Sequence, residues 1–352
     1  MKVLFTGGGT MGPVTPLLAV YEAWKKRDST LEVLWAGTAH GPEKSVIEAQ
    51  HIPFYSFPVA RFPRYVTWEW VLAPFRFVAA LYKATQLFRF EQIDLVASAG
   101  GYTAVPVILA AKIYGVKIWV HQQDAEILFT NRLTAPLADY LTVAWERNKK
   151  EFGSKARLVG NPVRSSVLLG SKDRGLERFL LDSTKPTVLV FGGGGGAVWL
   201  NRLVQEIVPK LVQQTNVIHI TGKGKNQTGF EHQNYYVCEF LDKDMADAYA
   251  LTDLVVCRAG LGTITELSAL AKPAIFIPLP RSAQEMNARM VESSSLVLDQ
   301  TDVTPELLFE TILDLLHDKT RLLELGEKLH RVLRTDVADE LVDLLSNKKQ
   351  AS

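Results

Sequence analysis

Three glycine-rich turns are the segments of the sequence best suited to chemistry. Gly7–Gly12 and Gly192–Gly196 each follow a short apolar run and precede a helical pattern, and Arg258–Thr263 repeats the arrangement. A glycine turn after a strand lets backbone N–H groups approach an anion, and the next helix N-terminus favours negative charge. Gly7–Gly12 and Gly192–Gly196 are not followed by the GK[ST] of a P-loop, and neither of these two runs has a complete dinucleotide fingerprint. Together the turns predict diphosphate binding, although each alone is also explained as a tight turn without a ligand.

The third turn, RAGLGTITE at Arg258–Glu266, adds a carboxylate to the glycines. A carboxylate near a helix start can accept hydrogen bonds from both hydroxyl groups of a ribose, as in dinucleotide-binding folds. Thr263 also lies three residues before Glu266, which is the spacing of a capping box. The spacing therefore leaves two hypotheses for Glu266, a ribose ligand and a helix cap.

The elements that must position these turns follow an α/β pattern. Short apolar runs alternate with longer helical patterns, which is typical of parallel sheets covered by helices. In the first half of the chain we expect strands at Lys2–Thr6, Leu31–Ala36, Asp94–Ser98, Lys117–His121, Tyr140–Ala144 and Ala156–Val159, and helices at Pro16–Lys26 and Ala104–Tyr114.

The pattern restarts in the second half. We expect strands at Thr187–Phe191, Asn216–Thr221, Tyr235–Glu239, Leu254–Cys257 and Ala274–Pro278, and helices at Val198–Gln214, at Thr263–Leu270 and from Pro305 onward. The polar stretch Ser171–Pro186 has the composition of a linker. Because each half opens with a strand, a glycine turn and a helix, we expect two nucleotide-binding-like domains that face one cleft.

Composition limits the class of protein further. The chain has 352 residues, of which 47% are hydrophobic, and this length predicts two domains with packed cores. Its net charge of +1 indicates no affinity for nucleic acid. Two cysteines, Cys238 and Cys257, exclude a disulfide scaffold and a cysteine-based zinc site, and favour a reducing compartment. The first residues lack the pattern of a signal peptide, and no apolar run is long enough to span a membrane.

The segment Arg61–Phe90 has the composition of a membrane-surface helix. It carries nine aromatic residues, one acidic residue (Glu69) and five basic residues, which are Arg61, Arg64, Arg76, Lys83 and Arg89. At helical spacing Trp68, Leu72, Phe75, Ala79 and Tyr82 share a face. Aromatic residues suit a membrane interface and basic residues suit anionic headgroups. The alternative is an ordinary core helix with solvated arginine tips.

Several motifs, in the same order along almost the whole chain, resemble those of the MurG family of bacterial glycosyltransferases. GGTMGPVTP at Gly8–Pro16 is similar to GGTGGHVFP, and HQQD at His121–Asp124, followed by TNR, is similar to HEQN. GNPVR at Gly160–Arg164 is unaltered, and GGGGGA at Gly192–Ala197 stands in place of GGSQGA. RAGLGTITE and the Gln284, Asn287, Ala288 set also match the family pattern.

This resemblance implies a GT-B fold, with two Rossmann-like domains, parallel sheets, an interdomain cleft and no required metal or other cofactor. The expected domains are residues 1–162, joined by a C-terminal helix at about 335–352, and residues 163–334. In the second domain Glu266 would bind the ribose, and Arg164 and the Gly192–Ala197 loop would bind the diphosphate. Gln284 would contact the donor sugar, and Leu241 would lie near the uracil. The expected donor site also includes Gly194, Leu261, Gly262, Thr263, Ile264 and Thr265 from the second domain, and Thr10, Met11, Gly12 and Asp124 from the first.

The departures from the family pattern concern the catalytic position. Pro13 stands where the family has histidine, Met11 replaces a glycine, and Gly194 replaces a serine. Gln122 and Asp124 replace a glutamate and an asparagine. An inverting transfer needs a base that takes the proton of the acceptor hydroxyl, and proline offers none. We therefore expect Asp124 to be the base and His121 to be the second candidate, with the alternative that His121 is satisfied within the fold.

The resemblance implies transfer of N-acetylglucosamine from UDP-N-acetylglucosamine to a lipid-linked muramoyl-pentapeptide, converting lipid I to lipid II in peptidoglycan synthesis. The implied location is the cytoplasmic face of the inner membrane, as a peripheral protein on an anionic surface. Two alternatives stay open: a UDP-sugar transferase with another acceptor, and a non-catalytic relative that binds the UDP-sugar. A nucleotide-dependent dehydrogenase is disfavoured by the incomplete dinucleotide fingerprint.

Overall fold

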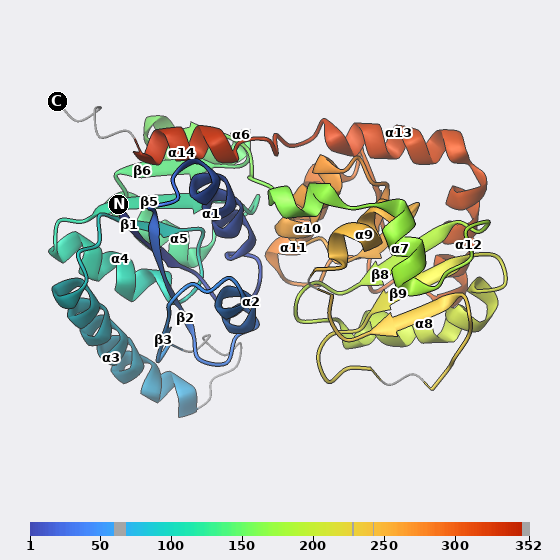
Figure 1. The fold of residues 1–352 in the computed structure, drawn as a ribbon, viewed down its shortest axis with the longest axis horizontal. Coiled ribbons are helices and arrows are strands. Elements are labelled where there is room, and N and C mark those ends of the chain that lie inside the picture. Colours follow the sequence, from blue (N-terminus) through green and yellow to red (C-terminus); the bar gives the residue numbers. More distant parts are fainter. Residues whose placement is uncertain (60–67, 227–228, 242, 347–352) are drawn as a thin grey trace. The chain divides into compact units, whose positions relative to one another are not determined.

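The computed structural model describes residues 1–59, 68–226, 229–241 and 243–346, and the side chains within these ranges except those of 68–71 (Figure 1). The chain divides into two compact units. The N-terminal unit consists of Met1–Pro162 and Asp336–Ser352, and the C-terminal unit of Val163–Thr335. Both are built on parallel sheets, which confirms the α/β class and the pair of Rossmann-like domains predicted from the alternating pattern.

The N-terminal unit contains a seven-stranded parallel sheet in the order β3-β2-β1-β4-β5-β6-β7. Its strands are β1 (Lys2–Thr6), β2 (Glu32–Thr38), β3 (Phe54–Phe57), β4 (Leu95–Ser98), β5 (Lys117–Gln122), β6 (Tyr140–Val143) and β7 (Ala156–Leu158). Successive residues of β1 enter different cores: Val3 and Phe5 pack on one face of the sheet and Leu4 on the other. A sheet buried on both faces explains why its strands are nearly continuous apolar runs.

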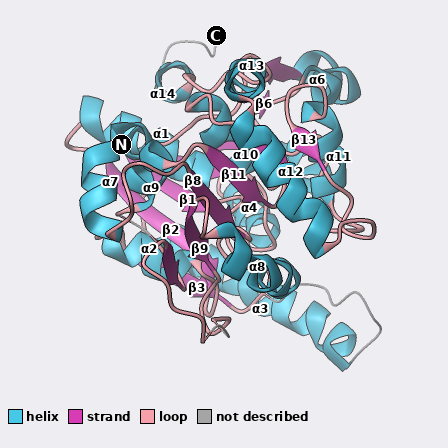
Figure 2. Cartoon of the chain, turned by 90° about the vertical axis from the view of Figure 1, so that its right-hand side faces the viewer, coloured by secondary structure: helices cyan, strands magenta, loops and turns pink. Residues whose placement is uncertain are grey.

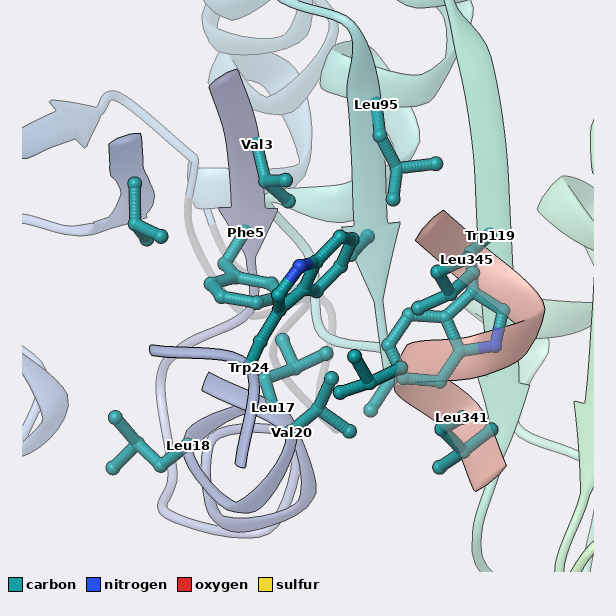
Figure 3. Packing of buried hydrophobic residues seen from close by; sticks show 14 of the residues in the cluster. Val3, Phe5, Leu17, Leu18, Val20, Trp24, Leu95, Trp119, Leu341 and Leu345 are labelled. Carbon is teal, nitrogen blue, oxygen red and sulfur yellow. The ribbon is translucent and has the colours of Figure 1, made fainter. Parts of the chain in front are cut away.

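Helices cover both faces of this sheet. They are α1 (Thr15–Arg27), α2 (Glu43–Ala49), α3 (Trp68–Phe90), α4 (Ala104–Ile113), α5 (Phe129–Thr134), α6 (Glu146–Phe152) and, from the end of the chain, α14 (Ala338–Ser346). Figure 3 shows Leu341 and Leu345 of α14 beside Trp119 of β5, in the core to which α1 contributes Leu17 and Trp24. The opposite face packs against α3 and α4. Burial of its apolar residues therefore makes α14 part of the N-terminal unit.

The C-terminal unit contains a six-stranded parallel sheet in the order β10-β9-β8-β11-β12-β13. Its strands are β8 (Thr187–Phe191), β9 (Asn216–Ile220), β10 (Tyr235–Cys238), β11 (Leu254–Cys257), β12 (Ala274–Phe276) and β13 (Leu296–Val297). Its α-helices are α7 (Lys172–Phe179), α8 (Val198–Leu211), α9 (Met245–Leu251), α10 (Leu261–Ala269), α11 (Ala283–Val291), α12 (Pro305–His317) and α13 (Lys319–His330), drawn in cyan in Figure 2. The apolar sides of α8 and α12 pack in one core with β8 and β11.

The linker predicted at Ser171–Pro186 is wrong over its first half, because this stretch forms α7. Ser171 caps the helix by accepting a hydrogen bond from the Arg174 backbone N–H. Arg174 and Arg178 then form ion pairs with Asp247 and Asp244, next to α9. The charges that suggested a solvated linker are thus partners in contacts within the C-terminal unit. Such pairs, between residues far apart in sequence, are invisible to composition.

Candidate active site

The two sheets have the same topology, and this determines where a ligand site is expected. In each, the chain runs outward from the first strand in one direction and then crosses to the other side, so that β1 lies beside β4 and β8 beside β11. In open α/β sheets, ligands bind beyond the carboxyl ends of the strands at this reversal. The glycine turns Gly7–Gly12, Gly192–Gly196 and Arg258–Thr263 follow β1, β8 and β11 directly. The fold therefore places all three at predicted ligand-binding edges.

The loop between β8 and α8 has the geometry of an anion site. Gly193 and Gly196 have φ angles of +80° and +66°, a region that residues with a side chain rarely adopt. A Cβ on Gly196 would lie 2.2 Å from the carbonyl oxygen of Thr221, so this position also needs glycine for close backbone packing. Gly194 is exposed at the tip, and α8 begins at Val198. The exposed loop backbone and the helix N-terminus together favour a phosphate group.

Glu266 is held by two side chains in the same unit. Arg164 Nη2 donates to Glu266 Oε1 at 3.0 Å, and the Tyr249 hydroxyl donates to Oε2 at 2.9 Å. Tyr249 is fully buried, and its pKa is raised well above the usual value, chiefly because burial disfavours the phenolate and also because of Glu266. Its ring meets Phe191, the last residue of β8, edge to face with the centroids 6.2 Å apart. These contacts link the carboxylate to the strand that ends in the glycine loop.

This arrangement contradicts the capping-box alternative for Glu266. Helix α10 begins at Leu261 with Gly260 as N-cap, two residues before the predicted start, and no side chain caps it. Thr263 is therefore already inside the helix. Leu261 and Ile264 are buried, and the buried Thr265 hydroxyl donates to the Leu261 carbonyl, so these residues pack α10 within the unit.

The remaining predicted donor residues also lie in the C-terminal unit. Gly262 and Thr263 are half-buried on α10, and Leu241 is half-buried after β10. Gln284, also half-buried, accepts a hydrogen bond from the Leu279 N–H at 2.9 Å, after β12. Arg258 of the third turn is buried, donates to the carbonyl oxygens of Ile277 and Pro278, and lies over the Trp199 ring. These contacts give Arg258 a structural role beside the site.

A buried carboxylate, which sequence reasoning missed, lies under the first glycine turn. Glu43 of α2 is fully buried and accepts hydrogen bonds from the Gly9 N–H at 3.1 Å, the Thr38 N–H at 2.8 Å and the Thr38 hydroxyl. A Cβ on Gly8 would lie 2.2 Å from its Oε1. Glu43 thus uses one of the N–H groups of this turn and places a carboxylate behind it, whereas among the described residues no carboxylate accepts a hydrogen bond from the backbone of the Gly192–Gly196 loop.

The other residues of this turn are arranged around the start of α1. Thr10 is exposed, Met11 and Gly12 are half-buried, and Pro13 is buried. A Cβ on Gly7 would lie 3.2 Å from the Pro13 Cβ, so the proline packs close to the loop backbone. Pro13 thus takes a structural place where the family has histidine.

His121 and Asp124 lie at and just after the end of β5, in the N-terminal unit. His121 is fully buried, and its ring nitrogens form hydrogen bonds with Thr142 Oγ1 and Asn161 Oδ1, both at 2.9 Å. Burial lowers the pKa of His121 to about 4, so the ring is neutral at pH 7. Asp124 is half-buried, and Gln122 Nε2 holds its backbone carbonyl at 2.7 Å. These contacts favour the alternative in which His121 is satisfied within the fold, and leave Asp124 as the more accessible candidate.

Glu43, under the first glycine turn, and Tyr249, beside Glu266, carried no signal in the sequence. Each lies on a short helix among ordinary helical residues, and its hydrogen-bond partners come from other elements. Across the ranges that the structure describes, no group of three or more His, Cys, Asp or Glu residues is placed to hold a metal ion.

Comparison with known proteins identifies the family. Two family models match the chain: the glycosyltransferase family 28 N-terminal domain over residues 3–142 and its C-terminal domain over residues 187–341. A Clostridium perfringens protein, described as UDP-N-acetylglucosamine–N-acetylmuramyl-(pentapeptide) pyrophosphoryl-undecaprenol N-acetylglucosamine transferase, is 33% identical over 322 residues, which cover 89% of this chain and 90% of that protein. A protein of the same description from Lachnospira eligens is 32% identical over 354 residues, covering 98% and 99% of the two chains.

A solved structure agrees with these relatives. The crystal structure of MurG from Acinetobacter baumannii matches with a TM-score of 0.70 and 27% identity, over 98% of this chain and 99% of that one. The fold is therefore GT-B, as the resemblance implied. The domain matches, the nearly full-length relatives and the shared fold show that this chain belongs to the MurG family within glycosyltransferase family 28.

Proposed function

We propose that this chain transfers N-acetylglucosamine from UDP-N-acetylglucosamine to a lipid-linked N-acetylmuramoyl-pentapeptide, forming lipid II from lipid I. The relatives described above carry this activity in their names. The observation that carries the proposal within the chain is the Glu266 site, where a carboxylate held by Arg164 and Tyr249 lies next to the strand that ends in the glycine loop. A ribose and a diphosphate are the ligands that such neighbours recognise.

The Arg164–Glu266 ion pair lies where we propose that the donor binds. Both oxygens of Glu266 already accept hydrogen bonds, from Arg164 and from Tyr249. A ribose diol brings two hydroxyl donors to this carboxylate, while the diphosphate offers Arg164 an anion of higher charge. We infer that Arg164 turns from Glu266 to the diphosphate as Glu266 accepts the ribose hydroxyls. The charge-assisted hydrogen bonds lost in this exchange are replaced by others of the same kind.

For the chemical step we propose Asp124 as the general base. The acceptor hydroxyl oxygen attacks the anomeric carbon, its proton passes to the Asp124 carboxylate, and the bond between the anomeric carbon and the phosphate oxygen breaks with inversion. UDP leaves with the bonding electron pair. His121 is a poorer candidate because its two ring nitrogens are engaged in hydrogen bonds and its pKa is about 4.

The test of the activity uses purified protein, UDP-N-acetylglucosamine and a lipid-linked muramoyl-pentapeptide, with the product identified by mass. We expect the disaccharide product. UDP binding is measured in the same sample by calorimetry. If UDP binds and no product forms, the acceptor differs or the chain is a non-catalytic relative, and other lipid and glycoside acceptors are then screened.

Asp124→Asn tests the base. We expect turnover to fall by about 10²–10⁴, the range of general base catalysis, while UDP affinity is retained. Glu126→Gln is the matched control, because Glu126 is an exposed carboxylate two residues further along the same loop. Turnover that is equal in Asp124→Asn and in the control would exclude Asp124 as the base.

We also propose that α3 binds an anionic membrane surface from the cytoplasmic side. Ala80, Ala84, Leu87 and Phe88 of α3 pack into the core, while Leu72, Phe75, Val78 and Tyr82 are exposed, with 71% of Phe75 and 66% of Tyr82 accessible. This arrangement favours a surface helix over the core-helix alternative. Lys83 and Arg89 are also exposed on α3, whereas Arg61, Arg64 and the side chain of Trp68 lie outside the described residues. An apolar face with basic neighbours fits anionic headgroups.

Cosedimentation with vesicles tests this surface. Vesicles of phosphatidylglycerol and phosphatidylcholine should retain the protein at low salt and release the variant Phe75→Ser/Tyr82→Ser. The control Leu323→Ser removes a similarly exposed apolar side chain from the C-terminal unit and should not change binding. Among the described residues, no helix is long and apolar enough to cross a membrane. Equal release of the control and the α3 variant would contradict the proposal.

A further inference from the structure

The turn that follows β9 places a lysine on the glycine loop of the donor site. We propose that Lys225 binds the diphosphate of the nucleotide-sugar donor, as a cation built into the Gly192–Ala197 loop. This inference rests on the donor site proposed above and adds to it a side chain that lies outside every motif of the sequence.

Lys225 is attached to the loop through its ammonium group. Its Nζ donates to the carbonyl oxygen of Gly195 at 2.6 Å and to that of Gly196 at 3.4 Å. The side chain is half-buried rather than extended into solvent. An ammonium group has three N–H donors, so a donor is left for a ligand at the loop. The positive charge is thus held where the glycine backbone favours an anion.

Backbone packing determines the position of the turn that carries Lys225. The Thr221 N–H donates to the Cys238 carbonyl at 2.9 Å, and the Lys225 N–H donates to the Gly222 carbonyl at 3.0 Å. A Cβ on Gly222 would lie 2.6 Å from the Gly196 Cα, which shows how closely the turn and the loop approach each other. The two glycines let the backbones touch, and this contact brings the Lys225 side chain to the loop.

The charge of Lys225 is available to a ligand. Among the described residues it forms no ion pair with a carboxylate, whereas Arg164 is paired with Glu266. Glu239, which follows β10, accepts a hydrogen bond from the Gly224 N–H at 2.9 Å. Arg258 is occupied by two carbonyl groups. The Lys225 ammonium group therefore lies at the loop, where it donates hydrogen bonds to neutral carbonyl groups.

This charge suits the proposed reaction. When the bond between the anomeric carbon and the phosphate oxygen breaks, negative charge grows on the leaving diphosphate, and a preorganised cation stabilises it. The family serine in this loop is replaced by Gly194, which has no hydroxyl to donate. Lys225 supplies a donor of higher charge at the same loop.

Calorimetric titration with UDP and with uridine tests the assignment. Lys225→Gln should weaken UDP binding by roughly tenfold, the effect of losing one charge-assisted hydrogen bond, and leave uridine binding within about twofold. Lys225→Arg should restore most of the UDP affinity because it keeps the charge. Lys223→Gln is the matched control: Lys223 is exposed two residues earlier, and its replacement should leave UDP affinity within about twofold.

The outcomes separate this inference from the proposed function. If Lys225→Gln binds UDP as tightly as the wild type does, the role of Lys225 is overturned and the donor site itself is not. Equal weakening of UDP and uridine would also overturn it, because Lys225 would then act by shaping the loop. Wild-type protein that binds no UDP would overturn the donor site itself. Stronger dependence of UDP affinity on salt in the wild type than in Lys225→Gln would support the assignment.

Discussion

The glycine loops after β1 and after β8 occupy equivalent positions in two sheets of the same strand order, yet side chains of opposite charge lie behind them. Glu43 accepts a hydrogen bond from the Gly9 N–H in the N-terminal unit, and Lys225 donates to the Gly195 and Gly196 carbonyls in the C-terminal unit. Each sheet has a strand-order reversal, and its carboxyl-terminal edge there is a predicted ligand-binding position. We expect the charge of the side chain under each loop to determine whether the edge favours an anion.

The structural demand on the two loops is similar. Each needs glycine because another group approaches its backbone: Glu43 lies against Gly8, and Gly222 lies against Gly196. Each unit also buries a histidine in its sheet, at His121 and His219. Packing requirements are thus shared, whereas charge differs. Glycine runs of similar appearance can therefore have different electrostatic surroundings.

The largest effect is expected when Glu43 is removed. Glu43→Ala removes three hydrogen bonds to a buried carboxylate, from the Gly9 N–H, the Thr38 N–H and the Thr38 hydroxyl, and should lower the free energy of unfolding of the N-terminal unit by roughly 3–5 kcal/mol. Hydrogen exchange of peptides from each unit measures this locally. Glu48→Ala, an exposed change on the same helix, should shift it by less than about 0.5 kcal/mol.

A second substitution at this position, Glu43→Gln, tests whether the two loops differ in ligand. UDP affinity should stay within about twofold of the wild type in Glu43→Gln, which is closer in shape and less disruptive than Glu43→Ala. A loss of UDP affinity as large as that expected for Glu266→Ala would show that the first loop binds the diphosphate, and the contrast between the loops would fail.

Acid should weaken both units in the same pH window. Burial lowers the pKa of His121 and of His219 from 6.5 to about 4. As the pH falls below 6.5, each histidine therefore becomes protonated in the unfolded chain while it stays neutral in the folded chain. Each histidine should remove about 2 kcal/mol of stability between pH 7 and pH 5. Above pH 6.5 this contribution is fully present.

Hydrogen exchange of the wild type and of His219→Gln, compared at pH 7 and pH 5, measures the effect in the C-terminal unit. The variant should lose less stability on acidification, because glutamine does not titrate and can still form hydrogen bonds with Tyr235 and Asn201. A wild type and a variant with the same pH dependence would show that His219 is not the group responsible.

Removal of Glu266 should weaken UDP binding while sparing the N-terminal unit. Glu266→Ala deletes a charge-assisted hydrogen bond worth about 1.5–3 kcal/mol, which corresponds to roughly a ten- to hundredfold loss of affinity. Glu310→Ala, on the exposed side of α12, is the matched control. Calorimetry that finds unaltered UDP affinity in Glu266→Ala would refute the ribose role.

The smallest effect is expected at Tyr249. Tyr249→Phe removes only the hydroxyl that donates to Glu266 Oε2. The loss of one hydrogen bond, about 0.5–1.5 kcal/mol, should weaken UDP and uridine by the same roughly two- to tenfold factor, since both carry the ribose. A selective loss for UDP would mean that Tyr249 acts on the diphosphate side instead, through Phe191 and the glycine loop.

Much of the fold could be predicted from local patterns. The strands at Lys2–Thr6, Thr187–Phe191 and Leu254–Cys257 have the predicted bounds, because a short apolar run buried on both faces has a strong local signal. The segment Lys172–Phe179 has the composition of a linker, yet it forms α7, whose Arg174 and Arg178 form ion pairs with Asp247 and Asp244. The start predicted for helix α10 is two residues late, because threonine is a common N-cap residue and Thr263 has the capping-box spacing to Glu266. Local sequence patterns fail to predict an element when contacts with residues distant in sequence determine its structure.

The α/β class, the two glycine-rich domains and the motifs that identify the family could all be found in the amino-acid sequence alone. These features depend on hydrophobic periodicity and on backbone freedom, which are properties of neighbouring residues. Three other features depend on tertiary packing: Arg164 and Tyr249 hold Glu266, Glu43 lies under one loop, and Lys225 lies on the other. Such contacts join residues from 17 positions apart, between Tyr249 and Glu266, to 102 positions apart, between Arg164 and Glu266. They form only when whole elements pack, so charge at a site is decided by the fold.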